Sequence, residues 1–278
     1  MRNRNASYSY DTKDSNQFLE AYMIHHQGLV LCITLFVGSF IGGCSTYRVP
    51  GGAADFHALG ITSDEQAELT EDSIARELAK KPASSFPANL AAVRVQARGY
   101  RSYTTQGYDY GNYSVVTLRE VESDTDIDSL ASLPMINNII PLNRLVIIDI
   151  KDESDIRKAA ARVQADMVLI YTFDTKFGVE SFIPALGVIT LGLFPNDEAR
   201  VTSTASAALI DTRTGFIYAL AESTADAKQI ANAWTSKDAV DQSRRRAERD
   251  AFEGLISELK KAWKQVVETY AISANDKE

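Results

Sequence analysis

The chain has 278 residues, a net charge of −8 and a hydrophobic fraction of 45%. The acidic balance argues against a nucleic-acid-binding protein, because a phosphate backbone is bound through clustered Lys and Arg. The chain has only three histidines and two cysteines, so it offers little for histidine-based catalysis or for zinc sites built on several histidines.

The N-terminal segment has the features of a signal peptide. An apolar stretch from Gly28 to Phe40 is too short for a membrane-spanning helix but matches the apolar region of a signal peptide. The residues that follow it, Ile41-Gly42-Gly43-Cys44, resemble the lipobox at which bacterial lipoproteins are cleaved and lipidated. The resemblance implies that residues 1–43 are removed and that Cys44 carries the lipid, which ties the chain to a membrane of the cell envelope.

Two details of this segment bear on the interpretation. Its first 20 residues hold three basic and three acidic side chains, whereas a signal peptide normally begins with net positive charge, so Met23 is the alternative to Met1 as the start of translation. An uncleaved anchor is the alternative to cleavage. By analogy with known lipoproteins, Ser45 after the cysteine indicates the outer membrane, with the domain facing the periplasm. Cleavage would remove Cys32, leaving no free thiol in the mature chain.

We expect three parts along the chain: the signal peptide at residues 1–43, a lipidated tether at 44–61, and a single α/β domain at 62–278. The tether contains His57 within the Gly- and Ala-rich run Gly51 to Gly60, which favours a flexible linker over a site.

The domain is predicted to begin with a helix over Thr62 to Lys80, with acidic residues in its first turns and Pro82 after its end. A strand follows over Ala91 to Arg98. Its alternation of apolar and polar residues predicts one buried face and one solvent-facing side that carries Arg94 and Gln96.

A tyrosine-rich connection follows this strand and resumes as a strand over Ser114 to Val121. Five tyrosines lie in it or at its end: Tyr100, Tyr103, Tyr108, Tyr110 and Tyr113. They could form a surface for a protein partner or a glycan, because tyrosine offers a large contact area at low entropic cost. Equally, they could be the packed edge of a sheet.

Three aspartates then follow Ser123 with the spacing that opens an EF-hand calcium loop: Asp124, Asp126 and Asp128. The pattern stops there, because Ser129 stands where the loop needs glycine and Met135 where it needs glutamate. We therefore predict a short helix capped by Ser123, with acidic residues in its first turn, and prolines breaking the segment after it.

The centre of the chain is predicted to be a strand, helix, strand unit, with a buried apolar strand at Arg144–Ile150, an amphipathic helix at Glu153–Ala165 and a second apolar strand at Asp166–Phe173. A hairpin follows, whose strands at 201–210 and 216–222 are joined by a turn in which Gly215 suits a positive φ. Together these elements predict a mixed β-sheet covered by helices, which is the α/β class.

Between these parts lies Val179 to Pro195, which holds no charge after Glu180 but is interrupted by two prolines and two glycines. Too short for a spanning helix, it could dip into a membrane, pack on another subunit, or be a buried crossover. Its candidate contact residues are Ile183, Leu186, Ile189, Leu191 and Phe194.

The last predicted element is a long helix over Lys237 to Tyr270 that lies across the sheet. Apolar residues recur along it three or four positions apart, except for a gap of seven after Val240. The basic triplet Arg244-Arg245-Arg246 stands among acidic residues, which indicates a solvated mixed-charge face rather than a phosphate-binding patch.

Two stretches resemble a known family. They are the unit Ala159 to Ile170, which contains Ala165-Asp166 before an apolar strand, and the hairpin turn Asp211-Thr212-Arg213-Thr214-Gly215. Both are similar to parts of envelope lipoproteins related to the curli secretion channel and the penicillin-binding-protein activator lipoproteins. The resemblance implies a non-enzymatic protein that assembles with itself or contacts an envelope partner.

Three functions are therefore open: a lipid-anchored protein-binding or assembly module, a subunit of a secretion or pore assembly, and a glycan hydrolase that uses two carboxylates. The acids available to the hydrolase are Asp109, Glu120, Asp149, Asp174 and Asp211, and the sequence does not place any two of them at the required separation. We assign no catalytic residue, metal ligand or cofactor.

Overall fold

The computed structural model describes residues 52–54, 71–117, 119–181, 197–230 and 237–271. Its helices are α2 (Glu71–Ala79), α3 (Asp124–Ala131), α4 (Glu153–Arg162) and α6 (Lys237–Val266), which continues as the π-helical turn η3 (Val267–Ala271). Its strands are β1 (Ala88–Ala97), β2 (Tyr108–Tyr110), β3 (Tyr113–Val116), β4 (Ile136–Pro141), β5 (Met167–Ser181), β6 (Asp197–Asp211) and β7 (Ile217–Ile230). None of the described helices is long and apolar enough to cross a membrane.

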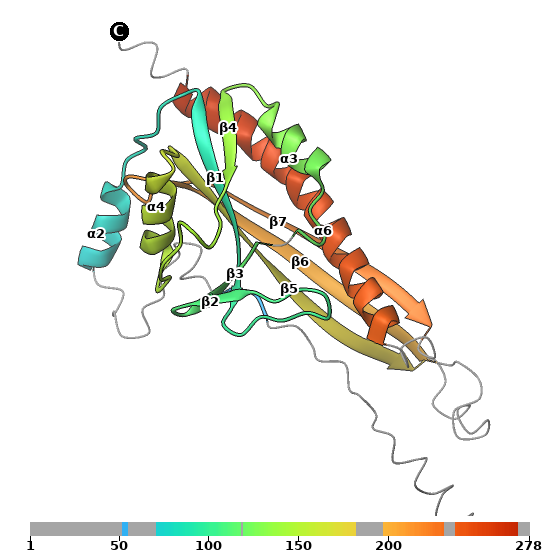
Figure 1. Ribbon diagram of the computed structural model, residues 1–278. Coiled ribbons are helices and arrows are strands. Elements are labelled where there is room, and N and C mark those ends of the chain that lie inside the picture. Colours follow the sequence, from blue (N-terminus) through green and yellow to red (C-terminus); the bar gives the residue numbers. More distant parts are fainter. Residues whose placement is uncertain (1–51, 55–70, 118, 182–196, 231–236, 272–278) are drawn as a thin grey trace, which may run out of the picture. The chain divides into compact units, whose positions relative to one another are not determined.

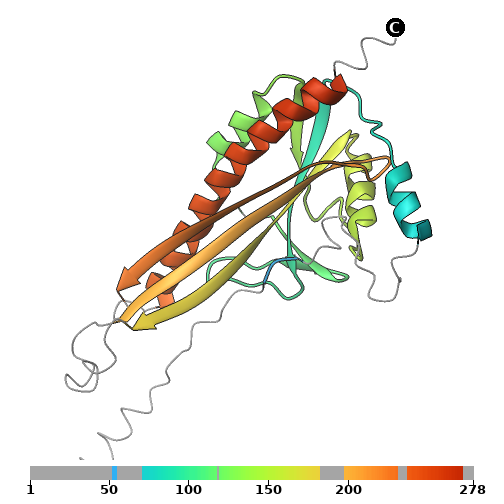
Figure 2. The ribbon, with the colours of Figure 1, turned by 180° about the vertical axis from the view of Figure 1, so that it is seen from behind.

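The strands form one mixed sheet in the order β2-β3-β1-β5-β6-β7, with β4 paired to β1 beside β3. β1 runs parallel to β4 and β5, and the other neighbouring pairs are antiparallel. α6 crosses β6 and β7 on one face of the sheet, and α4 covers part of the other face (Figures 1 and 2). The predicted mixed sheet, covered by helices and crossed by a long C-terminal helix, is confirmed.

Both faces of β1 are buried, whereas the sequence pattern predicted one solvent-facing side. Ala91, Val93 and Val95 point to the α4 side, where they join one apolar core. On the α6 side, Arg94 and Gln96 are only 2% and 1% exposed. The prediction was wrong because both side chains find polar partners inside the protein: Arg94 pairs with Glu122 and with Glu248 of α6, and Gln96 hydrogen bonds to Thr172 and Phe173 of β5.

The segment predicted as a buried strand at Arg144–Ile150 is irregular instead. The side chain of Asn143 accepts a hydrogen bond from the Leu145 amide (2.8 Å), and its carbonyl accepts one from the Val146 amide (3.2 Å), so the chain turns. The strand lies before this turn, as β4, where the prolines were expected to break the chain. Pro141 is tolerated there because it is the last residue of an edge strand.

The β6–β7 hairpin is confirmed and is longer than predicted. Asp211 Oδ1 accepts hydrogen bonds from the amides of Arg213 (2.9 Å) and Thr214 (3.0 Å), and Gly215 adopts a φ of +71°. Asp211 Oδ2 accepts further hydrogen bonds from the Ala83 amide (2.7 Å) and the Tyr218 hydroxyl (2.9 Å). One buried carboxylate thus closes the turn and ties the chain after α2 to it.

Residues 52–54 were expected within the flexible tether, but they lie against the sheet. The Gly52 carbonyl accepts a hydrogen bond from the Ala97 amide (3.1 Å), and the Ala54 amide donates one to Thr172 Oγ1 (2.9 Å). Ala54 is 5% exposed. Cys44, the signal peptide and His57 lie outside the described residues, as do positions 62–70 of the first predicted helix.

Candidate functional site

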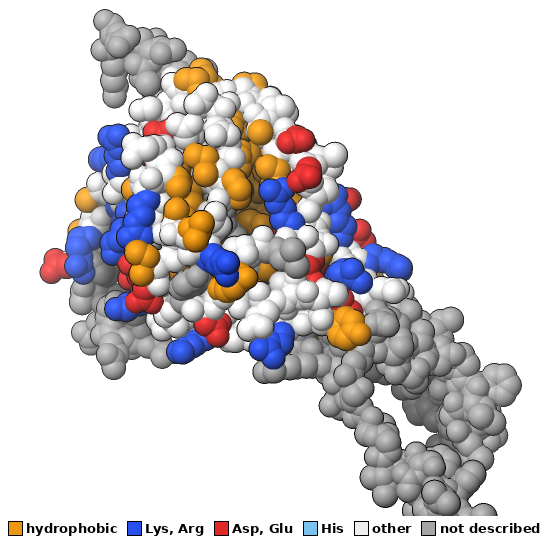
Figure 3. Space-filling view, in the orientation of Figure 1, with side chains coloured by type: hydrophobic (Ala, Val, Ile, Leu, Met, Phe, Trp, Pro, Cys, Tyr) orange, Lys and Arg blue, Asp and Glu red, His pale blue; other side chains and the backbone are white. Residues whose placement is uncertain are grey.

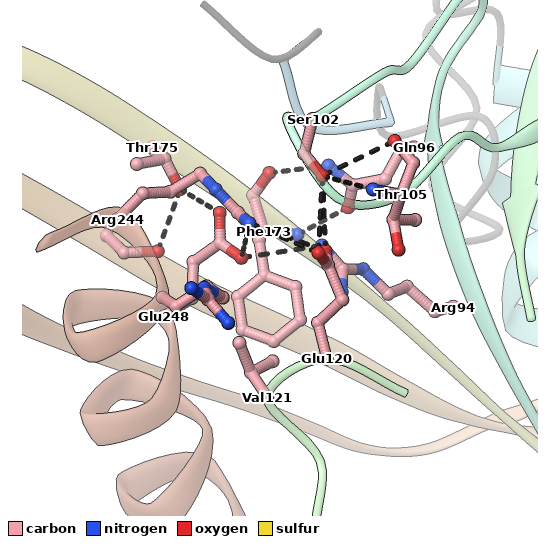
Figure 4. Close-up of polar contacts among 12 residues, drawn as sticks. Arg94, Gln96, Ser102, Thr105, Glu120, Val121, Phe173, Thr175, Arg244 and Glu248 are labelled. Carbon is pink, nitrogen blue, oxygen red and sulfur yellow. Dashed lines mark hydrogen bonds and ion pairs between the residues drawn. The ribbon is translucent and has the colours of Figure 1, made fainter. Parts of the chain in front are cut away.

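A cluster of charged side chains lies buried between the sheet and the first half of α6 (Figure 4). Arg94 comes from β1, Glu122 from the chain before α3, and Arg244 and Glu248 from α6, and each of these side chains is at most 1% exposed. Removing an ion from water costs several kcal/mol unless charged partners and hydrogen bonds replace the water. The contacts within the cluster therefore decide whether it can be stable.

Arg94 lies between two carboxylates. Its Nη1 is 3.5 Å from Glu122 Oε1, and its Nη2 is 3.6 Å from Glu248 Oε2. Nη2 also donates a hydrogen bond to the Tyr100 hydroxyl at 3.0 Å, and the guanidinium lies 4.5 Å from the centre of the Phe173 ring. The charge of Arg94 thus meets carboxylates at its edge and an aromatic ring on its face.

Arg244 joins three carboxylates, each with a different nitrogen. Its Nε lies 2.9 Å from Asp241 Oδ1, its Nη1 2.7 Å from Glu248 Oε2, and its Nη2 3.3 Å from Glu120 Oε1. Thr175 on β5 donates to the other oxygen of Glu248 at 3.0 Å. Only a planar guanidinium presents donors in three fixed directions, so this position suits Arg and not Lys.

The cluster shifts the acidities of its members. Burial alone would lower the pKa of Arg94, but Tyr100, Glu122 and Glu248 raise it above its ordinary value. Burial raises the pKa of the Tyr100 hydroxyl to about 12 and also raises the pKa of the Glu248 carboxyl. Both arginines keep their charge at any physiological pH, so the cluster is a fixed ionic framework.

Glu120, which contacts Arg244 of the cluster, also contacts the tyrosine-rich connection. Ser102 Oγ donates to Glu120 at 3.3 Å, and Thr104 hydrogen bonds to the same carboxylate. The Ser102 amide donates to the Thr105 carbonyl at 2.7 Å, which closes a tight turn. Ser102 and Thr105 are buried, whereas Tyr103 between them is 54% exposed. The ring of Tyr103 is therefore exposed to solvent, while the backbone of the turn that carries it is held by the contacts of its neighbours with Glu120.

The structure divides the five tyrosines between the two interpretations. Tyr100 and Tyr113 are 2% and 4% exposed and belong to the interior, whereas Tyr103 and Tyr108 are 54% and 41% exposed. The side chain of Tyr110 lies outside the described residues. Tyr100 and Tyr113 thus fit the packed sheet edge, while the partner surface stays a prediction for the exposed Tyr103 and Tyr108.

Of the predicted apolar contact segment, Val179 to Pro195, the structure describes only the first three residues, which belong to β5. β5 and β6 pair up to Ser181 opposite Asp197, so the segment 182–196 joins the ends of a long hairpin. Its candidate residues lie outside the described part of the chain, namely Ile183, Leu186, Ile189, Leu191 and Phe194.

The acids considered for a hydrolase each have a separate local role. Asp109 accepts hydrogen bonds from the Gly99 amide and Ser114, Asp149 pairs with Lys151, and Asp174 with Lys176. The remaining two are Glu120 in the charge cluster and Asp211 in the hairpin turn.

Of the three aspartates after Ser123, Asp124 and Asp126 lie in the first turn of α3, as predicted. Ser123 and Asp126 form a reciprocal capping box at the start of α3. Asp126 also pairs with Arg249 of α6, and Arg249 Nη1 donates to the Val121 carbonyl at 2.8 Å. Within the described residues, no group of His, Cys, Asp and Glu side chains is arranged to hold a metal ion.

Below the second half of α6 lies an apolar cavity of about 30 Å³, lined by residues that include Leu90, Leu209, Ala219, Leu259 and Trp263. An engineered cavity that binds benzene measures roughly 150 Å³, so this space is a packing gap rather than a ligand site.

Sequence reasoning missed the cluster because it assigned Arg94, Gln96 and Arg244 to solvent-facing positions. Arg244 is fully buried, while Arg246 is exposed as predicted. A signal was present, because Arg244 fills the gap of seven in the apolar stripe between Val240 and Ala247. A charged residue on the buried stripe of a helix indicates a buried partner of opposite charge.

No known family model matches the chain, and no curated protein is found to be related to it. The fold and the site define an α/β domain with a buried ionic framework and an ordered aromatic turn. What the chain does must therefore be argued from these features.

Proposed function

We propose that the chain is a lipid-anchored, non-enzymatic protein of the cell envelope whose domain acts as a protein-binding or assembly module. The sequence at Cys44 supports the anchor and the envelope location, facing the periplasm from the outer membrane. Tyr103 supports the binding role. Its ring is exposed while the turn that carries it is held by Glu120, so binding a partner would cost little ordering entropy.

A photo-crosslinking experiment tests the binding role in cells. p-Benzoylphenylalanine at Tyr103 should give a discrete adduct with an envelope protein or with a second copy of the chain. The same group at Leu220, which is 56% exposed on β7, serves as the control. Adducts of equal yield at both positions, or at neither, would overturn the proposal.

A second variant separates a fixed turn from a merely exposed one. Glu120→Gln weakens the contacts to Ser102 and Arg244 and should lower the yield at Tyr103 several-fold. Glu258→Gln removes one charge from an exposed pair with Lys261 on α6 and should leave the yield unchanged. Intact-mass measurement of the purified protein tests the anchor, because a cleaved chain that begins at a lipidated Cys44 has a defined mass.

The β5–β6 hairpin favours a second candidate, a subunit of a secretion or pore assembly. Its strands pair over their full 15 residues, and the segment that joins them is uncharged from Ser181 to Pro195. Such a hairpin could place an apolar segment against neighbouring subunits. This candidate predicts ring-shaped particles in detergent extracts, and monomeric particles would exclude it.

A further inference from the structure

Two large aliphatic side chains are exposed to solvent in the turn after β4. Leu145 is 83% exposed and Ile148 is 71% exposed. Burying such side chains stabilises a protein, and the fold forgoes most of that gain here. Scattered exposed aliphatics are ordinary, but two in one short turn form a local apolar surface.

The turn is rigid, because the residues around the two exposed side chains are anchored. Leu142, Ile147 and Ile150 are each less than 5% exposed and belong to the core on the α4 side. Arg162 of α4 donates from Nη1 to the Val146 carbonyl at 2.7 Å. The exposure of Leu145 and Ile148 is therefore built into the fold.

The surroundings of this surface are those of a membrane interface. Arg144 lies 5.3 Å from the centre of the Tyr108 ring, which is 41% exposed, and Lys151 is 72% exposed by its side chain. Acidic side chains also lie here, because Asp149 Oδ2 is 3.7 Å from Lys151 Nζ and Asp155 Oδ2 accepts a hydrogen bond from the Lys151 amide at 3.0 Å. Aliphatic side chains flanked by Tyr, Arg and Lys suit the boundary between lipid tails and headgroups. Figure 3 shows hydrophobic side chains gathered over β4 and the chain beside it, with Lys and Arg as well as Asp and Glu around them.

The docked segment at residues 52–54 shortens the length of chain between the domain and Cys44. Seven residues lie between Cys44 and Gly52, so the eight steps from one to the other span at most roughly 26–29 Å when the chain is fully extended. A tether that ended at residue 61 would have allowed about twice that reach. With the proposed lipid on Cys44, this reach sets the largest distance between the docked segment and the bilayer.

The docked segment and the turn lie at the same end of β1. Gly52 binds Ala97, which pairs with Tyr113 of β3. The neighbouring Asn112 amide donates to the Ile150 carbonyl at 2.9 Å. Both ribbon views show β2 and β3 beside the short segment at residues 52–54.

We infer that Leu145 and Ile148 insert into the interfacial region of the bilayer to which Cys44 is tied. The inference rests on the proposed lipid anchor and extends it, because it assigns the face of the domain that lies against the membrane. Burial of each side chain in the bilayer would strengthen membrane binding by the lipid on Cys44. That lipid already limits the distance between the domain and the membrane. The domain would then have one fixed orientation on the lipid surface.

Fluorescence of the full-length, processed protein tests the inference. In the mature chain the lipid occupies the thiol of Cys44, so Leu145→Cys provides a single site for an environment-sensitive label. The protein is reconstituted into vesicles of phosphatidylcholine and phosphatidylglycerol, with and without brominated acyl chains. Ile148→Cys repeats the measurement. Leu78→Cys on α2 and Leu220→Cys on β7 are the controls, at 77% and 56% exposure.

The expected result is blue-shifted emission at Leu145 and Ile148, with quenching by brominated lipid several-fold stronger than at either control. Equal quenching at all four positions would overturn the inference. So would a blue shift without quenching, which would mean that protein, such as a second copy, covers the turn. Intact mass separates the two claims, because an unlipidated Cys44 defeats both the anchor and the inference, whereas lipidated protein with unquenched labels defeats the inference alone.

Discussion

The two halves of α6 pack on the same sheet with opposite chemistry. The first half buries Asp241, Arg244 and Glu248, and the second half buries Leu255 and other apolar residues. Apolar contacts are non-directional and stabilise in proportion to the area they bury. Buried ion pairs add little net stability compared with apolar residues of the same size, but each contact is directional. The apolar half thus stabilises α6 on the sheet. The charged half, through its directional contacts, positions the residues that pack next to it.

The charged half connects the core to the surface. Glu248 contacts both arginines, and Glu120 joins Arg244 to the turn at Ser102. A purely apolar core would leave that turn without a partner. The two halves of α6 therefore have different roles: one stabilises the fold and the other positions the turn at Ser102. Each role can be tested by itself.

The largest effect is expected for Arg244→Met. The substitution keeps the volume but leaves Asp241, Glu248 and Glu120 without their shared guanidinium, so the free energy of unfolding should fall by about 4 kcal/mol. Arg246→Met is the matched control two positions away, and it should change that free energy by less than about 0.5 kcal/mol because Arg246 is exposed. Denaturant titration measures both, and equal losses would show that the ionic framework contributes nothing specific.

Leu255→Ala should destabilise the protein by about 3 kcal/mol through the cavity it leaves, without a local effect on the tyrosine turn. Arg244→Met should in addition speed hydrogen exchange at the Thr105 amide beyond what the global loss explains. Native-state exchange of both variants measures this difference. If Leu255→Ala loosened the turn as much as Arg244→Met does, positioning would not be a property of the charged half.

The sequence predicts those parts of the fold whose pattern is local. Ser123 as a helix cap, the turn from Asp211 to Gly215 and the long α6 are all read from short-range chemistry, and the structure confirms them. The stretch 144–150 was misread because a run of apolar residues suits a strand and a turn anchored at alternate positions equally well. The Asn143 turn decided between them.

The ionic framework could not be predicted because its members lie far apart in the sequence. Arg94 and Glu248 meet only after β1 and α6 have been brought together, and each by itself reads as a surface residue. The clue available beforehand was Arg244 within an apolar stripe. Polar positions that fall on a buried face deserve a search for distant partners of opposite charge.

Asp211→Asn tests a buried charge whose partners are neutral. The carboxylate accepts hydrogen bonds from backbone amides and from Tyr218, and these partners lower its pKa against the opposing effect of burial. Because hydrogen bonds to a charged group contribute about 1.5–3 kcal/mol, the variant should lose about 2 kcal/mol at pH 7. Because the pKa of this carboxyl is lowered in the folded protein, its charge stabilises the fold at pH values above the ordinary pKa of about 3.9. This contribution is lost as the pH falls through the lowered pKa.

The difference between wild type and Asp211→Asn should therefore be constant above about pH 5 and shrink below pH 4. Denaturation at a series of pH values measures it. Asp174→Asn, at a carboxylate that pairs with Lys176 on the surface, is the control and should show little difference at any pH. A pH-independent loss at Asp211 would indicate that packing, rather than the charge, holds the turn.

The smallest effect concerns the apolar half, where the cavity below α6 leaves room for a methyl group or slightly more. Ala219→Val on β7 fills it and should raise the free energy of unfolding by about 1 kcal/mol. Ala221→Val is the control. It lies two residues along the same strand on the same face, so it gains the same strand preference but lies away from the cavity. Only the difference between the two variants reports cavity filling, and thermal denaturation resolves it. A lower stability for Ala219→Val than for Ala221→Val would mean that this half is already packed to its limit, because overpacking costs about 1–3 kcal/mol.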